Sequence, residues 1–298
     1  MNITSLQTFL AIVETGSLVR ASEQMNVTQS TVTARLNTLE DHLGTQLLNR
    51  QKSGTTLTPA GTKFLRYARA MAGIWRQAKH ATALPSGFDS ICTFGCDREL
   101  WHGPGRGFFN GLMSGQPEMA VSVHQGSGRD LESWLAEGMV DVVLTYESGA
   151  RSNQTIHPLP PEELVLYSNH PDTPIDADPR YIFVDHGPDY RKLHDETYHN
   201  AGVDRISFDS SWWALQCMLD RGGSAYLPRA LADPFAARGD IHVLKDGPVF
   251  TRKKNLIVND LVAQNWHWLP ALIERLSEPA AAHPADKTDD ATAQNGPI

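Results

Sequence analysis

Residues 27–50 read VTQSTVTARLNTLEDHLGTQLLNR and combine two patterns in one predicted helix. Val32, Leu36, Leu39 and Leu43 recur at helical spacing, which predicts a buried stripe. The start of the helix instead carries small hydroxyl side chains, one amide and, a turn later, Arg35. Because the inner face is ordinary core, any special function belongs to the outer face of the first turns.

Two shorter helices are predicted before this one. The expected caps and stops are Thr4 and Gly16 for the first helix, Ser17 for the second, and Thr28 and Gly44 for the third. The expected inward residues are Leu6, Phe9, Leu10 and Val13 in the first helix and Leu18, Ala21 and Met25 in the second. Two short helices joined by a tight turn, with small Ala21 where they approach, are typical of a helix-turn-helix at about residues 17–37.

A small basic hairpin is predicted directly after the third helix. Short strands are expected around residues 47–50 and 56–58, joined by a turn at Ser53-Gly54, with Arg50 and Lys52 at its tip. Such a hairpin is a wing that lies along a phosphate backbone. The alternative is an ordinary solvated turn.

A long helix over residues 59–83 is predicted to follow, with Thr58 as its cap and Pro59 at its first position. Its apolar residues Phe64, Ala68, Met71, Trp75 and Ala78 alternate at spacings of four and three, as in the seam of a coiled coil. We expect this seam to form a dimer. Packing of the helix on its own domain would produce the same spacing.

The rest of the chain has α/β texture. A hinge is expected at residues 84–89, an α/β domain at 90–278 and a disordered tail at 279–298. Short apolar strands alternating with helical stretches predict a parallel sheet with crossover helices. The expected strands are 90–96, 121–125, 140–146, 163–168, 181–185, 205–208, 223–228 and 255–260.

Composition and charge limit the class of protein. The chain has 298 residues, of which 41% are hydrophobic and 20% charged, so two globular domains are expected. No apolar run approaches the roughly 20 residues that span a bilayer, and no leader pattern opens the sequence, so we expect a soluble cytoplasmic protein. The three cysteines are expected to be free thiols.

The net charge of −8 is unevenly distributed. Up to residue 85 there are nine Lys or Arg against four acids, which leaves 17 of the 26 basic and 30 of the 34 acidic residues for the remainder. A basic head on an acidic body indicates a polyanionic partner for the head alone. Chance distribution of solvated charges is the alternative.

Together these features resemble the DNA-binding end of a LysR-type transcriptional regulator. The matching elements are Leu6-x-x-Phe9, Gly16-Ser17, Ala21, Thr28-Gln29-Ser30, Leu39-Glu40, Leu43-Gly44, Leu47-Leu48-x-Arg50 and Leu57-Thr58-x-Ala60-Gly61. Many members of the family have proline at the position of Ser30 and arginine at that of Ala34, whereas here the arginine is Arg35. This run also resembles a branch of the family linked to flagellar gene control.

The resemblance implies a winged helix-turn-helix domain at residues 1–58, a linker helix and a two-subdomain effector domain like a periplasmic solute-binding protein. Subdomain I would comprise residues 90–160 and 261–278, and subdomain II residues 161–260, with chain crossings near 160 and 260. Members of the family are commonly tetramers, or dimers of dimers, on bent DNA, whereas the sequence itself favours only pairing of two chains. A two-fold dimer would read two half-sites about 34 Å apart.

The third helix is expected to enter the major groove of DNA. The predicted DNA-binding residues are Ser17, Thr28, Gln29, Ser30, Thr31, Thr33, Ala34, Arg35, Asn37, Arg50 and Lys52. Gln29 suits adenine and Arg35 suits guanine, while short neighbouring side chains allow close approach to the bases. The alternative is that Arg35 contacts phosphate only.

Ligands of open α/β folds bind at strand ends and helix N-termini. The predicted effector-binding residues are Cys96, Asp97, Arg98, Gln125, Gly126, Ser127, Thr145, Ser210 and Ser211. Arg98 favours an anionic effector, and we expect a small polar or carboxylated metabolite. Ser127, Ser210 and Ser211 would equally serve as helix caps.

No enzyme, metal or cofactor site is predicted. His186, His194 and His199 cluster with acidic residues, but no hydrolase, zinc-binding, P-loop or dinucleotide-binding motif accompanies them, so a solvated surface is expected. The predicted function is a DNA-binding regulator whose effector changes the angle between the subdomains and thereby DNA bending and access of RNA polymerase. The alternative is an α/β small-molecule-binding protein whose head serves association.

Overall fold

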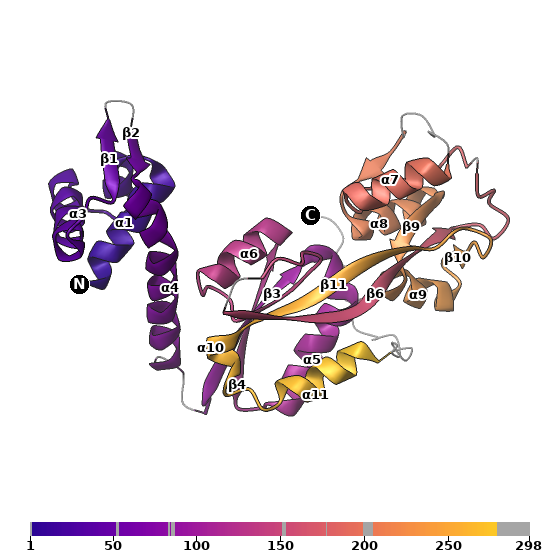
Figure 1. Ribbon diagram of the computed structural model, residues 1–298. Coiled ribbons are helices and arrows are strands. Elements are labelled where there is room, and N and C mark those ends of the chain that lie inside the picture. Colours follow the sequence, from indigo (N-terminus) through magenta and orange to yellow (C-terminus); the bar gives the residue numbers. More distant parts are fainter. Residues whose placement is uncertain are drawn as a thin grey trace, which may run out of the picture.

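A small helical head and a larger α/β body are joined by one long helix in the computed structural model of the chain (Figure 1). The structure describes residues 2–51, 54–82, 84, 87–150, 153–176, 178–198 and 205–278. The predicted fold class, a winged helix-turn-helix with a linker helix and a two-subdomain α/β domain, is confirmed. The expected turn residue Ser53 and the tail 279–298 lie outside the described residues.

The head contains three helices, a two-stranded hairpin and the start of the linker helix. Its elements are α1 (Ile3–Thr15), α2 (Leu18–Gln24), α3 (Gln29–Leu43), β1 (Leu48–Gln51), β2 (Gly54–Leu57) and α4 (Pro59–Thr82). The side chains of Ser17 and Thr28 cap α2 and α3, as predicted. Gly16 and Gly44, with φ of 65° and 66°, end α1 and α3 in the left-handed conformation that glycine adopts without strain.

Two details of the head differ from the sequence prediction. Asn2, not Thr4, caps α1, because the Asn2 side chain accepts the Thr4 N–H at 3.0 Å. Leu43 is 39% exposed, because it is the last residue of α3 and lies beyond the core cluster. Val32, Leu36 and Leu39 are fully buried among α1, α2 and the wing.

The linker helix is tied tightly to the wing. Thr58 accepts the Gly61 N–H at 2.9 Å and donates to the Gln46 carbonyl at 2.7 Å, so one hydroxyl caps α4 and fastens it to the chain before β1. Gly61 lies so close to Leu47 that a β-carbon there would overlap the Leu47 carbonyl oxygen. The orientation of α4 on the head is therefore fixed at its first turn.

The body is one mixed sheet with helices on both faces and a small separate two-stranded sheet. The strands of the body are β3 (Ser90–Asp97), β4 (Met119–Gly126), β5 (Val142–Thr145), β6 (Gln154–Ser168), β7 (Phe183–Val184), β8 (Ser207–Phe208), β9 (Ser224–Pro228), β10 (His242–Val243) and β11 (Phe250–Asn259). The helices are η1 (Arg98–Leu100), η2 (Trp101–Gly105), α5 (Arg106–Gly115), α6 (Gly128–Ala136), α7 (Pro188–Thr197), α8 (Ser211–Arg221), α9 (Arg229–Arg238), α10 (Asp260–Ala263) and α11 (Leu269–Ser277).

Two long strands, β6 and β11, connect the subdomains (Figure 1). The large sheet has the order β10-β6-β11-β5-β3-β4, and β9 pairs with β6. β3 is parallel to β4 and β5, but β6 and β11 are antiparallel to their neighbours, so within the large sheet the predicted parallel pairing holds only for β3, β4 and β5. The small sheet of β7 and β8 is also parallel. β11 is paired with β5 from Asn255 onward, so the return to the first subdomain comes before residue 260, where the sequence had placed it.

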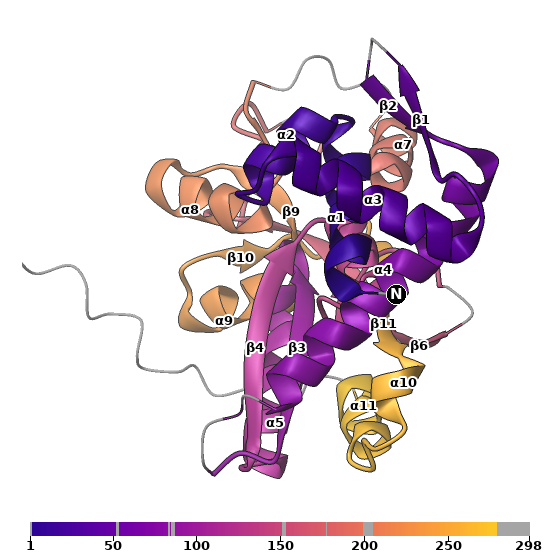
Figure 2. The same ribbon diagram turned by 90° about the vertical axis from the view of Figure 1, so that its left-hand side faces the viewer.

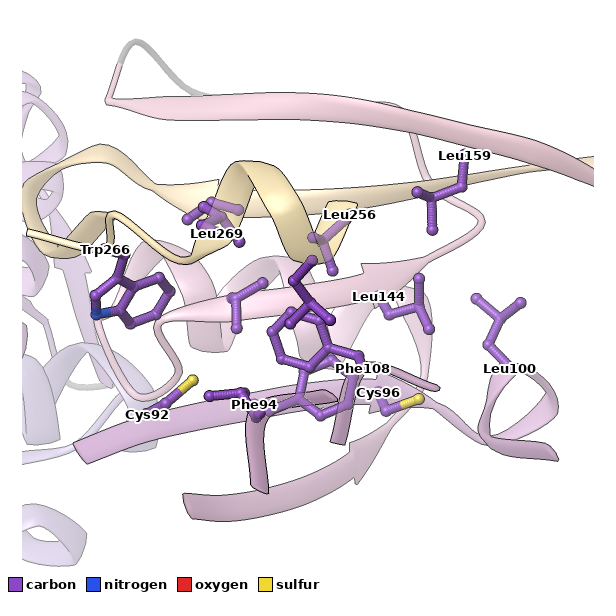
Figure 3. Packing of buried hydrophobic residues seen from close by; sticks show 14 of the residues in the cluster. Cys92, Phe94, Cys96, Leu100, Phe108, Leu144, Leu159, Leu256, Trp266 and Leu269 are labelled. Carbon is purple, nitrogen blue, oxygen red and sulfur yellow. The ribbon is translucent and has the colours of Figure 1, made fainter. Parts of the chain in front are cut away.

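The first subdomain has a core on each face of its sheet. On one face, Phe94 packs against Phe108 of α5 with ring centroids 4.5 Å apart, and Trp266 and Leu269 close the cluster (Figure 3). On the other face, Leu131 and Leu135 of α6 pack on the sheet beside Gly95, whose missing side chain leaves room for Leu131. Helix α6 is therefore held rigidly on the sheet.

The second subdomain also has two cores. One packs α8 and α9 on β9 and the end of β6, and the other is an aromatic cluster beneath α7. No helix in the described part of the chain is long and apolar enough to cross a membrane.

Candidate functional site

The outer face of α3 presents most of the predicted DNA-binding residues to solvent. Gln29, Ser30, Ala34 and Asn37 are exposed, whereas Thr31, Thr33 and Arg35 are half-buried. The Thr28 hydroxyl lies 2.8 Å from both the Ser30 and the Thr31 hydroxyls, so the first turn carries a connected row of small polar groups. Helix α3 faces away from the body and toward the viewer in Figure 2.

The wing stands beside this helix and is fixed by Glu40, a residue of the quoted motif for which the sequence indicated no structural role. The Glu40 carboxylate of α3 accepts the backbone N–H groups of Leu47 at 2.7 Å and Leu48 at 3.2 Å. Glu40 thus positions β1 relative to α3. Of the predicted wing residues, Lys52 lies outside the described part of the chain, as does the side chain of Arg50.

The predicted dimerisation seam is divided between two environments. Ala68 is buried, and Phe64 and Met71 pack on the core of the head, where Phe64 lies 5.5 Å from Phe9 between ring centroids. Trp75 is 44% exposed and Ala78 is exposed. The first three residues therefore have the role that the alternative interpretation gave them, packing on their own domain. Tyr67 and Ile74 are further exposed apolar residues of α4.

Several predicted effector-binding residues belong to the core or to local turns. Cys96 is 2% exposed within the main core, and burial raises the pKa of its thiol (Figure 3). Thr145 is fully buried and accepts the Glu147 N–H at 3.1 Å. Ser127 caps α6 in a reciprocal box with Asp130, which is the alternative role considered for it.

The remaining candidates are differently placed. Gln125 is exposed near the end of β4, Gly126 lies beneath the Trp134 ring, and Arg98 is exposed. Ser210 and Ser211 are almost fully buried at the start of α8. The structure thus separates the candidates, and Asp97 and Ser211 are joined through Glu99 where the two subdomains meet.

A hydrogen-bonded chain crosses the boundary between the subdomains there. Asp97 accepts the Glu99 N–H at 3.1 Å, and the Glu99 carboxylate accepts the Ser211 N–H at 2.9 Å. Nearby, the rings of His102 and Trp212 stack with centroids 5.0 Å apart. The segment after β3 therefore links the first subdomain to the start of α8 in the second.

Three further residues form a cluster at the boundary, with Glu162 on β6, Arg252 on β11 and Tyr146 directly after β5. The Tyr146 hydroxyl donates to Glu162 at 2.7 Å, and the Arg252 guanidinium carbon lies 3.5 Å from the centroid of the Tyr146 ring. Arg252 Nη1 is 3.8 Å from the Glu162 carboxylate, which is an ion pair but too long for a hydrogen bond. Among the described residues, this buried nitrogen has no hydrogen-bond partner.

Burial governs the electrostatics of the boundary. It raises the pKa values of Asp97 and Glu162 and lowers the pKa of Lys254, so each charged form is disfavoured. Tyr146 is the last residue of the strand predicted at 140–146, but the sequence did not indicate Glu162 or Arg252. These two face each other only through the antiparallel register of β6 and β11, which local pattern does not reveal.

The histidine cluster is not a solvated surface, contrary to expectation. His186 and His194 are 4% and 3% exposed, because they pack among Phe183, Tyr190 and Tyr226. Burial lowers the pKa of His186 to about 3, so its ring is neutral. His199 lies outside the described residues, and within them no group of His, Cys, Asp or Glu is arranged to hold a metal ion.

An outward polar helix on a winged helix-turn-helix, joined to a two-subdomain α/β domain, defines a DNA-binding regulator with a sensory domain. Comparison with protein families matches the bacterial regulatory helix-turn-helix protein model of the lysR family at residues 3–62 and the LysR substrate binding domain at residues 107–260. The chain belongs to the LysR family of transcriptional regulators.

Individual relatives agree with this assignment. The HTH-type transcriptional regulator HdfR of Escherichia coli is 26% identical over 284 residues, covering 89% of this chain and 98% of that protein. ArgP from Mycobacterium tuberculosis has a similar structure, with a TM-score of 0.63, 18% identity, and coverage of 92% of this chain and 96% of that one. Full-length LysG from Corynebacterium glutamicum with bound effector Arg has a TM-score of 0.59, 19% identity and coverage of 93% and 98%.

Proposed function

We propose that this regulator reads DNA sequence through the first turns of α3, with Gln29 and Arg35 contacting base edges. The observation that carries the proposal is the row of short polar side chains on the outward face of a helix whose other face is fully buried. Short residues let the backbone of α3 approach the major groove, where the amide and the guanidinium reach adenine and guanine. Ser17, at the start of α2, and the wing would contact phosphates.

Selection of bound fragments from sheared genomic DNA, followed by binding assays on the best fragment and a shuffled version of it, tests this proposal. Arg35→Ala is expected to weaken binding to the selected fragment about 5-fold to 150-fold, because a bidentate base contact contributes about 1–3 kcal/mol, and to weaken binding to the shuffled DNA much less. Arg221→Ala, which removes an exposed arginine from α8, is the control. Equal losses on both DNAs would show that Arg35 contacts phosphate only.

Pairing of two chains would double the DNA contacts. The exposed apolar residues Tyr67, Ile74 and Trp75 on α4 support a dimer, which could assemble further into a tetramer. Sedimentation of Trp75→Glu should then show a weaker dimer than Glu14→Gln, an exposed change on α1. Acting on DNA, such an assembly would work in the cytoplasm and affect access of RNA polymerase.

The effector is proposed to carry an anionic oxygen group that binds Arg252. A buried guanidinium nitrogen without an acceptor is costly, and a ligand carboxylate or phosphate would supply the missing bond. Ser211, at the start of α8, supports the same assignment, because its buried hydroxyl also has no partner among the described residues. Arg98, the residue favoured from the sequence, is exposed.

A thermal-shift screen of metabolite carboxylates, phosphates, neutral sugars and amines tests the effector class. Stabilisation by anionic compounds is expected for the native protein and for Arg221→Gln, and its loss is expected in Arg252→Gln. Stabilisation by neutral or cationic compounds alone, or an unchanged response in Arg252→Gln, would contradict the assignment. Small-angle scattering with an active compound should then show the change in subdomain angle.

A further inference from the structure

We propose that Gly73 and Arg76 are positioning residues that dock the linker helix on the carboxyl end of α6, so that α6 couples the effector domain to the DNA-binding head. This inference concerns regulation and rests on the proposed function. It arises from contacts between α4 and the residues that follow α6, two segments about sixty residues apart in the chain. In Figure 1 one end of α6 points toward α4.

The closest contact is between two glycines. Gly73 is buried, and a β-carbon on it would overlap the carbonyl oxygen of Glu137. Gly138 has a φ of 63°, and a β-carbon on it would lie 3.0 Å from the Gly73 Cα atom. The two backbones therefore touch directly, which any larger residue at position 73 would prevent.

Two arginines of α4 surround this contact. Arg76 Nη2 donates to the Glu137 carbonyl oxygen at 2.9 Å, and Arg69 Nε lies 3.6 Å from the Glu137 carboxylate. Ser133 donates to the same carboxylate oxygen at 2.9 Å, which holds the Glu137 side chain on α6. Because the last carbonyls of a helix lack intrahelical donors and carry partial negative charge, the end of α6 is a favourable site for a guanidinium.

The other end of α6 lies close to the boundary between the subdomains. Gly128, its first residue, is so near Glu147 that a β-carbon would lie 2.8 Å from the Glu147 side chain. Glu147 directly follows Tyr146, whose ring packs under Arg252, and its carbonyl accepts the Asn255 side chain at 2.9 Å. Helix α6 thus begins beside the cluster of Tyr146, Glu162 and Arg252 and ends against the linker helix.

Helix α6 is rigid enough to transmit a displacement between these ends. Its nine residues span roughly 13 Å, and Leu131 and Leu135 anchor it on the sheet. A shift of the Glu147 segment, produced when a ligand engages Arg252, would move α6 and change its fit against Gly73. The orientation of the head, and hence the spacing of paired recognition helices, would then depend on the effector.

Gly73→Ala is a clean test because it has opposite expected effects with and without docking. Within a helix, alanine is favoured over glycine by about 1 kcal/mol, so an undocked α4 would be unharmed or stabilised. If α4 is docked, the new methyl collides with Glu137, and amide hydrogen exchange in residues 69–79 and 134–140 should rise about 5-fold or more, the lower range of a coupling effect. Gly115→Ala, at the end of α5 with nothing within 4 Å, is the matched control.

Arg76→Ala is a second test of the docking, and it introduces no steric clash. It should raise exchange in the same two segments, Arg76→Lys should restore much of the protection, and Lys79→Ala, an exposed change on the same helix, should have no effect. Because Gly73 and Arg76 act on one contact, their effects on exchange and on affinity for the selected DNA fragment should be less than additive when combined.

The outcomes separate this inference from the proposed function. Unchanged exchange in both Gly73→Ala and Arg76→Ala would overturn the docking, whatever the protein does with DNA. Raised exchange with unchanged DNA affinity of the dimer would overturn the coupling. Failure of the native protein to select any DNA would overturn the proposed function while the exchange experiment still decides the docking.

Discussion

The recognition helix and the boundary between the subdomains both carry functional polar groups, but they use their hydrogen-bonding capacity differently. In the first turn of α3, the Thr28 hydroxyl lies 2.8 Å from the hydroxyls of Ser30 and Thr31. At the boundary, Glu99 and Glu162 already accept bonds from Ser211 and Tyr146. The polar groups of the head therefore lie on a face that DNA can reach directly, whereas a ligand at the boundary would meet carboxylates that already have partners beside an unpartnered nitrogen of Arg252.

This difference implies two kinds of sensitivity. The head depends on apolar packing that holds its polar face outward. Substitutions in its apolar core should therefore impair its function. The boundary depends on a buried polar network, so removal of a single hydrogen-bonding atom there should lower the stability of the protein.

The largest effect is expected from the stripe that supports α3. Leu36→Ala should lower the free energy of unfolding by about 2–5 kcal/mol, because it opens a cavity where a leucine is fully buried. Leu43→Ala, in the same helix at 39% exposure, should cost far less. Denaturant unfolding measures both, and similar losses for the two variants would show that α3 is not held by this stripe.

The boundary should respond to removal of one oxygen atom. Tyr146→Phe leaves the ring under Arg252 but deprives the buried Glu162 carboxylate of its donor, at an expected cost of about 1–3 kcal/mol. Tyr67→Phe, on an exposed tyrosine of α4, is the control. If Tyr146→Phe is as stable as the native protein in thermal unfolding, the boundary network does not contribute as described.

The free energy of unfolding should depend on pH through a group at the boundary as well. Because burial raises the pKa of Glu162, the native state keeps a proton there to a higher pH than the unfolded chain does. The contribution of this group is thus most favourable below its ordinary pKa and is lost as the pH rises through the raised value. Between the ordinary and the raised pKa, the free energy of unfolding measured with denaturant should fall by at most about 1.4 kcal/mol per pH unit. Glu162→Gln should remove this slope. A slope that persists in Glu162→Gln would assign it to Asp97 or another group.

The head could be predicted from the sequence, whereas the boundary between the subdomains could not. Apolar periodicity, caps and glycine stops are local signals, so α1 to α4 and the outward residues of α3 were predictable. The boundary was not, because Glu162 and Arg252 are ninety residues apart and meet only through the pairing of β6 with β11. Local reasoning instead selected residues at strand ends, such as Cys96 and Thr145, which face the core.

The wing and the histidines show the same limit. Glu40 was visible within the quoted motif, but its bonds to Leu47 and Leu48 depend on how the chain turns after Gly44. His186 and His194 stand among charged residues in the sequence, which suggested a surface. They are buried because aromatic residues from α7 and from β9 surround them.

The smallest effect, and the sharpest test of the head, is expected at Thr28. Its hydroxyl accepts the Thr31 N–H at 3.3 Å, so Thr28→Ala should cost about 1 kcal/mol and speed exchange of the Thr31 amide, while Thr28→Ser should retain the cap. The same hydroxyl also orders Ser30, which lies on the outward face. Thr28→Ala should therefore weaken DNA binding more than its stability loss accounts for, since the folded fraction remains high after a loss of about 1 kcal/mol. Unchanged affinity at full folding would mean that order in the first turn of α3 is not needed for recognition.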